Sequence, residues 1–265
     1  MKSSYREALK SSALIGGSSM LTIAIGMIRT KIVAVVLGPS GVGLFGLYGS
    51  IVDLTASVAG LGVSSSGIRQ IAEANASGDG ERTARTARAM QLTLLFLGLA
   101  AAAVVVLAAA PLSTLVKGSD AFAGSVAVLS AAVLCRLLYD SRIAVIQGLR
   151  RIGDMARVGA IGAALGTCAT VPLVMVFGEA GVAPSIAAAA AASLATVLWF
   201  YRRVRLPSVA HDRTDLRAYV GPLLRLGVAF LASAVLTIGV AFIIRLLITR
   251  ELGIHAAGLY QCAWT

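Results

Sequence analysis

Long apolar runs separated by short polar segments make up most of this 265-residue chain. Six runs have the length and character of membrane-spanning helices, at about residues 11–37, 42–66, 89–110, 122–147, 158–177 and 182–201. A seventh run lies at about 219–248, and an eighth begins at about residue 256. An α-helix needs about 20 predominantly apolar residues to cross a bilayer. The pattern therefore predicts an all-α, polytopic membrane protein.

The composition favours the same class. Hydrophobic residues form 58% of the chain and charged residues only 13%, whereas a soluble domain carries roughly 25% charged residues. So few charges cannot cover the surface of a soluble fold of this size. A membrane β-barrel would need alternating apolar and polar positions, and the runs rich in alanine, leucine and glycine do not alternate.

An internal repeat divides the chain. A shift of 215 positions places Leu37–Phe45 over Leu252–Tyr260 and brings Arg29 within one position of Arg245. Chance similarity between two glycine-rich bends is the alternative explanation. With an even number of spans between them, both copies would have one orientation, as in parallel-repeat transporters.

The repeat predicts two unequal parts. Residues 1–205 would form an N-terminal six-helix transmembrane lobe. Residues 206–265 would form a cytoplasmic loop, span seven and the start of span eight of an incomplete second lobe. Because the sequence ends inside an apolar segment, we expect it to be a truncated product.

The basic residues predict the orientation in the membrane. They gather in alternate polar segments, and the segments on the side of the N-terminus contain Lys2, Arg6, Lys10, Arg69, Arg82, Arg85, Arg88, Arg150, Arg151, Arg157, Arg202, Arg203, Arg205, Arg213 and Arg217. The opposite side has little beyond Lys117 and Arg250. The positive-inside rule therefore places the N-terminus in the cytoplasm. The net charge of +11 has this topological explanation, and no nucleic-acid partner is expected because no aromatic residues are interleaved with the cations.

Charged side chains inside the predicted spans are the candidate functional residues, because a charge in hydrocarbon is costly unless it faces a cavity or a partner. Arg29 shares a helical face with residues expected to line a cavity, namely Ser18, Thr22 and Gly26. Span four carries three polar residues on one side, namely Arg136, Asp140 and Gln147, and Gln147 is also expected to line the cavity.

Three arginines, Arg29, Arg136 and Arg245, predict a cavity for an anion such as a diphosphate, which guanidinium groups bind in forked geometry. Asp53 and Asp140 could exchange H⁺ or Na⁺ during transport, or each could be the counter-ion of a neighbouring arginine. Arg136 and Asp140 could equally form a structural pair four residues apart.

Nucleotide and metal chemistry are not predicted. Gly41–Gly46 fits G-x-G-x-x-G, but a dinucleotide-binding turn needs a βαβ unit and an acidic residue about 20 positions on, and positions 58–66 contain no Asp or Glu. No Walker A pattern occurs, and the three cysteines lie far apart. We therefore predict no catalytic residue, no metal and no bound cofactor, and a protein that is not an enzyme.

Several stretches resemble bacterial O-antigen translocases, the polysaccharide flippases of the multidrug/oligosaccharidyl-lipid/polysaccharide exporter superfamily. The stretches are 13–19, 28–31, 37–48 and 60–72, with a looser match around Gly258-Leu259-Tyr260. The resemblance implies two six-helix lobes around a cationic cavity in the bacterial inner membrane. It also implies that an oligosaccharide linked to undecaprenyl diphosphate is flipped from the cytoplasmic to the periplasmic leaflet by alternating access. Arg29 is the position that the resemblance carries over as a cavity cation.

Other functions stay open at this point. The expected partners are a lipid-linked oligosaccharide, membrane lipids and other membrane proteins of polysaccharide assembly. An exporter of cations or drugs on the same fold would favour acidic cavity residues. A membrane enzyme of polyprenyl-phosphate chemistry would place carboxylates or histidines in loops as a motif, and the acidic loop residues here are scattered. An inactive fragment of a flippase and a purely structural subunit are the remaining alternatives.

Overall fold

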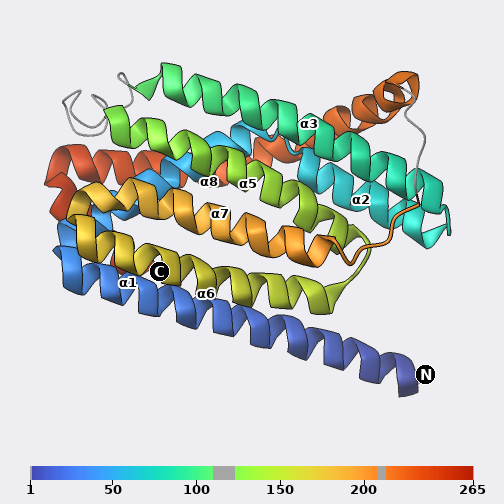
Figure 1. Ribbon diagram of the computed structural model, residues 1–265, viewed down its shortest axis with the longest axis horizontal. Helices are drawn as coiled ribbons and strands as arrows, with labels where there is room; N and C mark the ends of the chain where they lie inside the picture. The colour runs from blue at the N-terminus through green and yellow to red at the C-terminus, as the bar shows by residue number, and fades with distance from the viewer. Residues whose placement is uncertain (1, 110–122, 208–212, 265) are drawn as a thin grey trace.

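The computed structural model describes residues 2–109, 123–207 and 213–264, and every regular element within these ranges is helical. The elements are α1 (Lys2–Ala59), α2 (Val63–Ala76), α3 (Gly80–Leu107), α5 (Ala123–Gly148), α6 (Ile152–Phe177), the 3-10 helix η2 (Gly178–Gly181), α7 (Val182–Tyr201) and α8 (Arg213–Trp264). The long helices lie roughly side by side in one elongated bundle (Figure 1). The predicted all-α class is confirmed.

Two helices bend sharply at a glycine. Gly38 interrupts α1 with φ 68° and ψ −175°, and Gly253 interrupts α8 with φ 83° and ψ 168°. Residues with a Cβ rarely adopt this region of the backbone map. Both bends lie at the same end of the bundle, where the chain turns back (Figure 1). The shift of 215 positions found in the sequence relates these two glycines, so the aligned positions share one backbone conformation.

The two bends pack against each other through glycines. A Cβ added to Gly43 would collide with the carbonyl oxygen of Ile254 and lie 2.9 Å from the nitrogen of Gly258. A Cβ added to Gly258 would collide with the carbonyl oxygen of Pro39. The same shift relates Gly43 to Gly258 and Pro39 to Ile254. The contact is therefore reciprocal, and it requires small residues on both helices.

The helix that contains predicted span two ends at Ala59, before the predicted boundary at Ser66. The chain then turns through Leu61 (φ 47°) and Gly62 (φ 63°) before α2 begins. At this turn the backbone of α8 comes very close. A side chain on Gly62 would collide with the carbonyl oxygen of Gly227, and one on Gly227 with that of Leu61.

Spans three to six agree with the prediction to within a few residues at their apolar ends. α3 and α6 begin earlier than predicted because polar segments continue the helix. Asp79 caps α3 by accepting a hydrogen bond from the backbone N–H of Arg82 at 2.9 Å. α7 has the predicted bounds.

The exterior of the bundle is apolar, as expected of a protein surrounded by lipid. Met20, Val35 and Leu107 are 74%, 77% and 84% exposed. Four stretches are long and apolar enough to cross a membrane, namely Gly16–Ala59, Gly80–Leu107, Ile152–Tyr201 and Tyr219–Ala263. Three of them contain a bend or turn and are 44, 50 and 45 residues long, which exceeds the length of one crossing. The chain is a multi-pass membrane protein.

Helix α5, the predicted span four, is not among these four stretches. It packs against α3 and α7, and its side chains Leu129, Val133 and Leu137 are buried in the main apolar core. Two of its charged residues, Arg136 and Asp140, line a cavity within the bundle.

Candidate functional site

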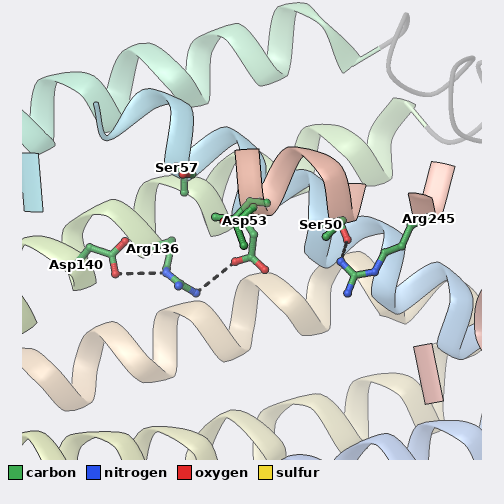
Figure 2. A pocket seen from close by; sticks show the side chains of 10 residues that line it. Ser50, Asp53, Ser57, Arg136, Asp140 and Arg245 are labelled. Atoms are coloured by element: carbon green, nitrogen blue, oxygen red, sulfur yellow. Dashed lines mark hydrogen bonds and ion pairs between the residues drawn. The ribbon is translucent and has the colours of Figure 1, made fainter. Parts of the chain in front are cut away.

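A polar cavity of about 460 Å³ lies between α1, α5 and α8. We call it the central cavity. Its walls are Ser50, Asp53, Ala56 and Ser57 from α1, Arg136 and Asp140 from α5, and Thr237, Ile238, Ala241 and Arg245 from α8 (Figure 2). On each helix the lining residues recur every three or four positions, so each helix contributes one face.

Arg136 lies between the two carboxylates of the cavity. Its Nη1 is 3.5 Å from Oδ1 of Asp53, and its Nε is 3.3 Å from Oδ1 of Asp140 (Figure 2). Both distances exceed the roughly 2.7–2.9 Å of a tight charge-assisted hydrogen bond. The side chains of Arg136 and Asp53 are both 50% exposed, so the group is accessible from the cavity. The ion pair between Arg136 and Asp140 is therefore present, and a second ion pair connects Arg136 to Asp53 on α1.

Arg245 has a different environment. Its Nη1 donates a hydrogen bond to the hydroxyl of Ser50 (Figure 2), and its Nε is buried with no hydrogen-bond partner. Within the described part of the chain, no carboxylate lies within ion-pair distance of this guanidinium. A partly buried cation that lacks an acidic partner is less stable than a paired one, and an anion in the cavity would supply the missing partner.

Two close backbone contacts lie beyond the two ends of this cavity. Gly43 and Gly258 touch at the end near the bends, and Gly62 and Gly227 touch at the other end. The lining residues 50–57 of α1 and 237–245 of α8 fall between these contacts along both helices. Access along the α1–α8 seam is therefore narrow at both ends.

Four of the predicted site residues meet in the central cavity, namely Asp53, Arg136, Asp140 and Arg245. Arg29 is not among the residues that line it. The guanidinium carbon of Arg29 instead lies 5.3 Å from the centre of the Phe45 ring, and its Nε is buried with no hydrogen-bond partner. In this structure Arg29 thus lies apart from Arg136 and Arg245, on the other side of the Gly38 bend.

The other predicted lining residues also lie outside this cavity. Thr22 donates a hydrogen bond to the carbonyl oxygen of Ser18 at 2.9 Å, and a Cβ on Gly159 of α6 would be 3.7 Å from the Thr22 hydroxyl. Nothing lies within 4 Å of a Cβ built on Gly26. This face of α1 packs towards α6 at Thr22. Gln147, two turns beyond Asp140, is exposed outside the cavity lining.

Sequence reasoning missed two hydroxyl-bearing residues of the cavity, Ser50 and Thr237. The helical period contained the signal, because Ser50 lies three residues before Asp53 and Thr237 lies eight before Arg245, on the same faces. Serine and threonine are common in membrane helices as local hydrogen-bonding residues, so hydroxyl spacing alone does not indicate a cavity.

The sequence matches the family of polysaccharide biosynthesis proteins over residues 8–265. The chain belongs to this family. No curated protein gives a significant match.

Solved membrane transporters have the same fold. One is an inward-facing multidrug resistance transporter of the MATE family in the MOP superfamily, with a TM-score of 0.70 and 17% identity. An outward-facing structure of such a transporter matches with a TM-score of 0.69 and 20% identity. A MOP superfamily transporter from Pyrococcus furiosus matches with a TM-score of 0.70 and 18% identity, and it is described as having a binding pocket of reverse polarity. The matches cover 92%, 96% and 96% of this chain but only 57%, 59% and 59% of those chains, so this chain spans less than two thirds of their length.

Proposed function

We propose that this polysaccharide biosynthesis protein flips an oligosaccharide linked to undecaprenyl diphosphate, such as an O-antigen repeat unit, across the bacterial inner membrane. The N-terminus would be cytoplasmic, and the substrate would move to the periplasmic leaflet. The protein would act as a transporter rather than as an enzyme. The observation that carries the proposal is Arg245, a guanidinium inside a membrane cavity whose buried Nε has no partner.

The charges of the cavity favour an anionic substrate. Both carboxylates lie near Arg136, whereas Arg245 bonds to the hydroxyl of Ser50 and to no carboxylate among the described residues. A diphosphate oxygen at Arg245 would satisfy the guanidinium in forked geometry. Asp53 and Asp140 are proposed to take up H⁺ or Na⁺ when the substrate enters, since this would release Arg136 as a second cation for the diphosphate.

Alternating access would use the two glycine contacts. Separation of Gly62 from Gly227 would open the cavity towards the N-terminal end of the bundle, and separation of Gly43 from Gly258 towards the bends. Backbone contacts without side chains can close and open with little rearrangement of neighbouring rotamers.

A cation or drug exporter is the second candidate. Two of the four charged groups in the cavity are carboxylates, and the MATE neighbours are described as multidrug resistance transporters. For this function, Asp53 or Asp140 would have to break its ion pair with Arg136 and bind the cationic substrate instead.

The test is a flipping assay in proteoliposomes that contain the chain and a fluorescent oligosaccharide on a polyprenyl diphosphate, with ethidium uptake measured in parallel. We expect flipping above that of protein-free vesicles. Arg245→Gln should lower it about tenfold or more, because a hydrogen bond to a charged group is worth roughly 1.5–3 kcal/mol. Arg29→Gln, measured beside it, tests the remaining proposal that Arg29 also contacts substrate.

Lys31→Gln is the matched control, because Lys31 is an exposed cation on the same helix as Arg29 and should have no effect. Ethidium transport without flipping would favour the exporter. Flipping that is unchanged by Arg245→Gln would contradict the proposed role of the central cavity.

A further inference from the structure

A second cavity, of about 650 Å³, lies at the end of the bundle opposite the two bends. It is formed by α2, α3 and the first part of α8. The lining is Arg69, Gln70, Glu73, Arg82, Tyr219, Pro222, Arg225 and Leu226. We propose that this arginine pocket binds the diphosphate group of a membrane lipid at the membrane surface, before that group enters the central cavity.

Three cations reach the arginine pocket from three helices, Arg69 on α2, Arg82 on α3 and Arg225 on α8. Arg82 and Arg225 are exposed and make no ion pair within the described part of the chain. Convergence of unpaired guanidinium groups from separate elements is the arrangement that binds phosphate oxygens bidentately.

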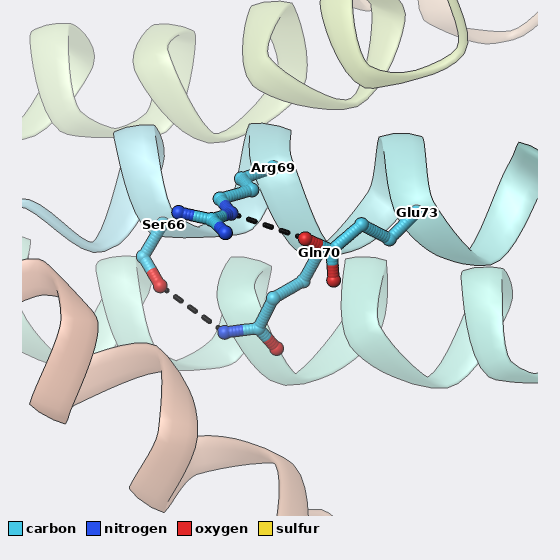
Figure 3. A network of polar contacts seen from close by, with 4 residues as sticks. All are labelled: Ser66, Arg69, Gln70 and Glu73. Atoms are coloured by element: carbon cyan, nitrogen blue, oxygen red, sulfur yellow. Dashed lines mark hydrogen bonds and ion pairs between the residues drawn. The ribbon is translucent and has the colours of Figure 1, made fainter.

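One carboxylate partly offsets these cations. Nε of Arg69 lies 3.0 Å from Oε1 of Glu73 (Figure 3), and both side chains are more than half exposed, at 63% and 55%. Gln70 faces the same wall and donates a hydrogen bond to the hydroxyl of Ser66 at 3.1 Å. Among the described lining residues, three cations and one anion leave a formal charge of +2. This complements a diphosphate diester with two negative charges better than a phospholipid phosphodiester with one.

The position of the arginine pocket fits a lipid headgroup. The apolar run predicted as span seven begins at about residue 219, directly after the last basic residue of the polar segment, Arg217. Tyr219 lines the pocket with Pro222 and Leu226. Tyrosine is typical of the boundary between membrane and water, and basic pockets between helices at this level bind phosphate headgroups. The apolar residues would contact the first part of the lipid chain while the arginines hold the diphosphate.

The arginine pocket also adjoins the route to the central cavity. Arg225 and Leu226 immediately precede Gly227, whose contact with Gly62 separates the two cavities along the α1–α8 seam. A diphosphate bound here would be positioned to enter when Gly62 and Gly227 separate. The inference thus deepens the proposed function and rests on it for the identity of the ligand.

The test measures binding rather than transport. The full chain in phosphatidylcholine nanodiscs is titrated with farnesyl diphosphate as the probe, and the dissociation constant is measured. Arg82→Gln and Arg225→Gln should each weaken binding about tenfold, because each removes charged hydrogen bonds. Glu73→Gln should tighten binding, because it removes the one negative charge among the described residues of the lining. A purely structural role of the Arg69–Glu73 pair does not predict tighter binding.

The matched control is Arg202→Gln. Arg202 is an exposed arginine at the same end of the bundle, outside the arginine pocket, so the substitution removes the same charge and should not change the affinity. If Arg202→Gln weakens binding as much as Arg225→Gln, the effect is general electrostatic attraction and the arginine pocket is refuted.

Two competitors identify the source of the anion. Inorganic diphosphate that displaces the probe supports recognition of the anion itself. Phosphatidylglycerol that displaces the probe equally well contradicts the preference for diphosphate.

Arg245→Gln separates the two proposals. If only this substitution abolishes probe binding, the probe binds in the central cavity, so the arginine pocket is refuted while the proposed function stands. If flipping is absent but the effects at positions 73, 82 and 225 hold, the proposed function fails and the arginine pocket stands.

Discussion

At the scale of single residues, the central cavity depends on how Arg136 is compensated. Its two carboxylate partners come from different helices, Asp53 from α1 and Asp140 from α5. Neither ion pair is short, and all three side chains are partly exposed, so each pair alone contributes little after solvent screening. Loss of one carboxylate should therefore change the stability little, because the other remains as the counter-ion of Arg136.

The expected result is a non-additive double mutant. Asp53→Asn and Asp140→Asn alone should each lower the thermal stability slightly, because Arg136 keeps one counter-ion. The double variant should lose more unfolding free energy than the two single variants together, by roughly 1 kcal/mol, because neighbours in one charge network couple. In the double variant Arg136 would have neither carboxylate as a partner. Thermal unfolding of the purified protein in detergent measures this. Additive shifts would mean that the two carboxylates act independently.

At the scale of helices, α1 and α8 approach each other closely at glycines, where a larger residue would collide with the facing backbone. Gly43→Ala or Gly258→Ala should destabilise the protein by roughly 1–3 kcal/mol, as overpacking does, because the added methyl would collide with the facing backbone. Gly26→Ala on α1 and Gly239→Ala on α8 are the controls, since a Cβ there meets nothing closer than 4 Å. They should be neutral or stabilising, because alanine favours helix more than glycine does. Equal effects of all four substitutions on the unfolding temperature would contradict the claim that close packing at Gly43 and Gly258 stabilises the protein.

The same helices illustrate what a sequence can predict. The bends at Gly38 and Gly253 could be found because glycine spacing repeats along the chain, and a helical period also placed Arg136 and Asp140 on one face. A period does not say which neighbour covers a face. For this reason the helical period did not separate Arg29 from the central cavity. The break at Gly62, where Gly227 of α8 comes close, could not be foreseen either. The same limit applies to the arginine pocket, whose cations lie on three separate helices.

At the scale of the whole molecule, the polar ends of the bundle differ in charge. The turn between α2 and α3 and the segments after α5 and α7 lie at the end where α1 begins (Figure 1). The arginines of the polar segments gather at this end, namely Arg69, Arg82, Arg85, Arg88, Arg150, Arg151, Arg157, Arg202, Arg203 and Arg205. The bends and η2 lie at the opposite end. The positive-inside rule predicts that the first end faces the cytoplasm.

Cysteine labelling in intact cells tests this orientation. Cys135, Cys168 and Cys262 are free and would first be replaced by serine. Ser77→Cys, exposed in the turn between α2 and α3, and Ala180→Cys, exposed in η2, then mark the two ends. A membrane-impermeant maleimide that crosses the outer membrane should label Ala180→Cys in intact cells, because η2 would face the periplasm, and should label Ser77→Cys only after the inner membrane is opened. The reverse pattern would place the arginine pocket on the periplasmic side, where it could not receive a lipid-linked substrate from the cytoplasmic leaflet.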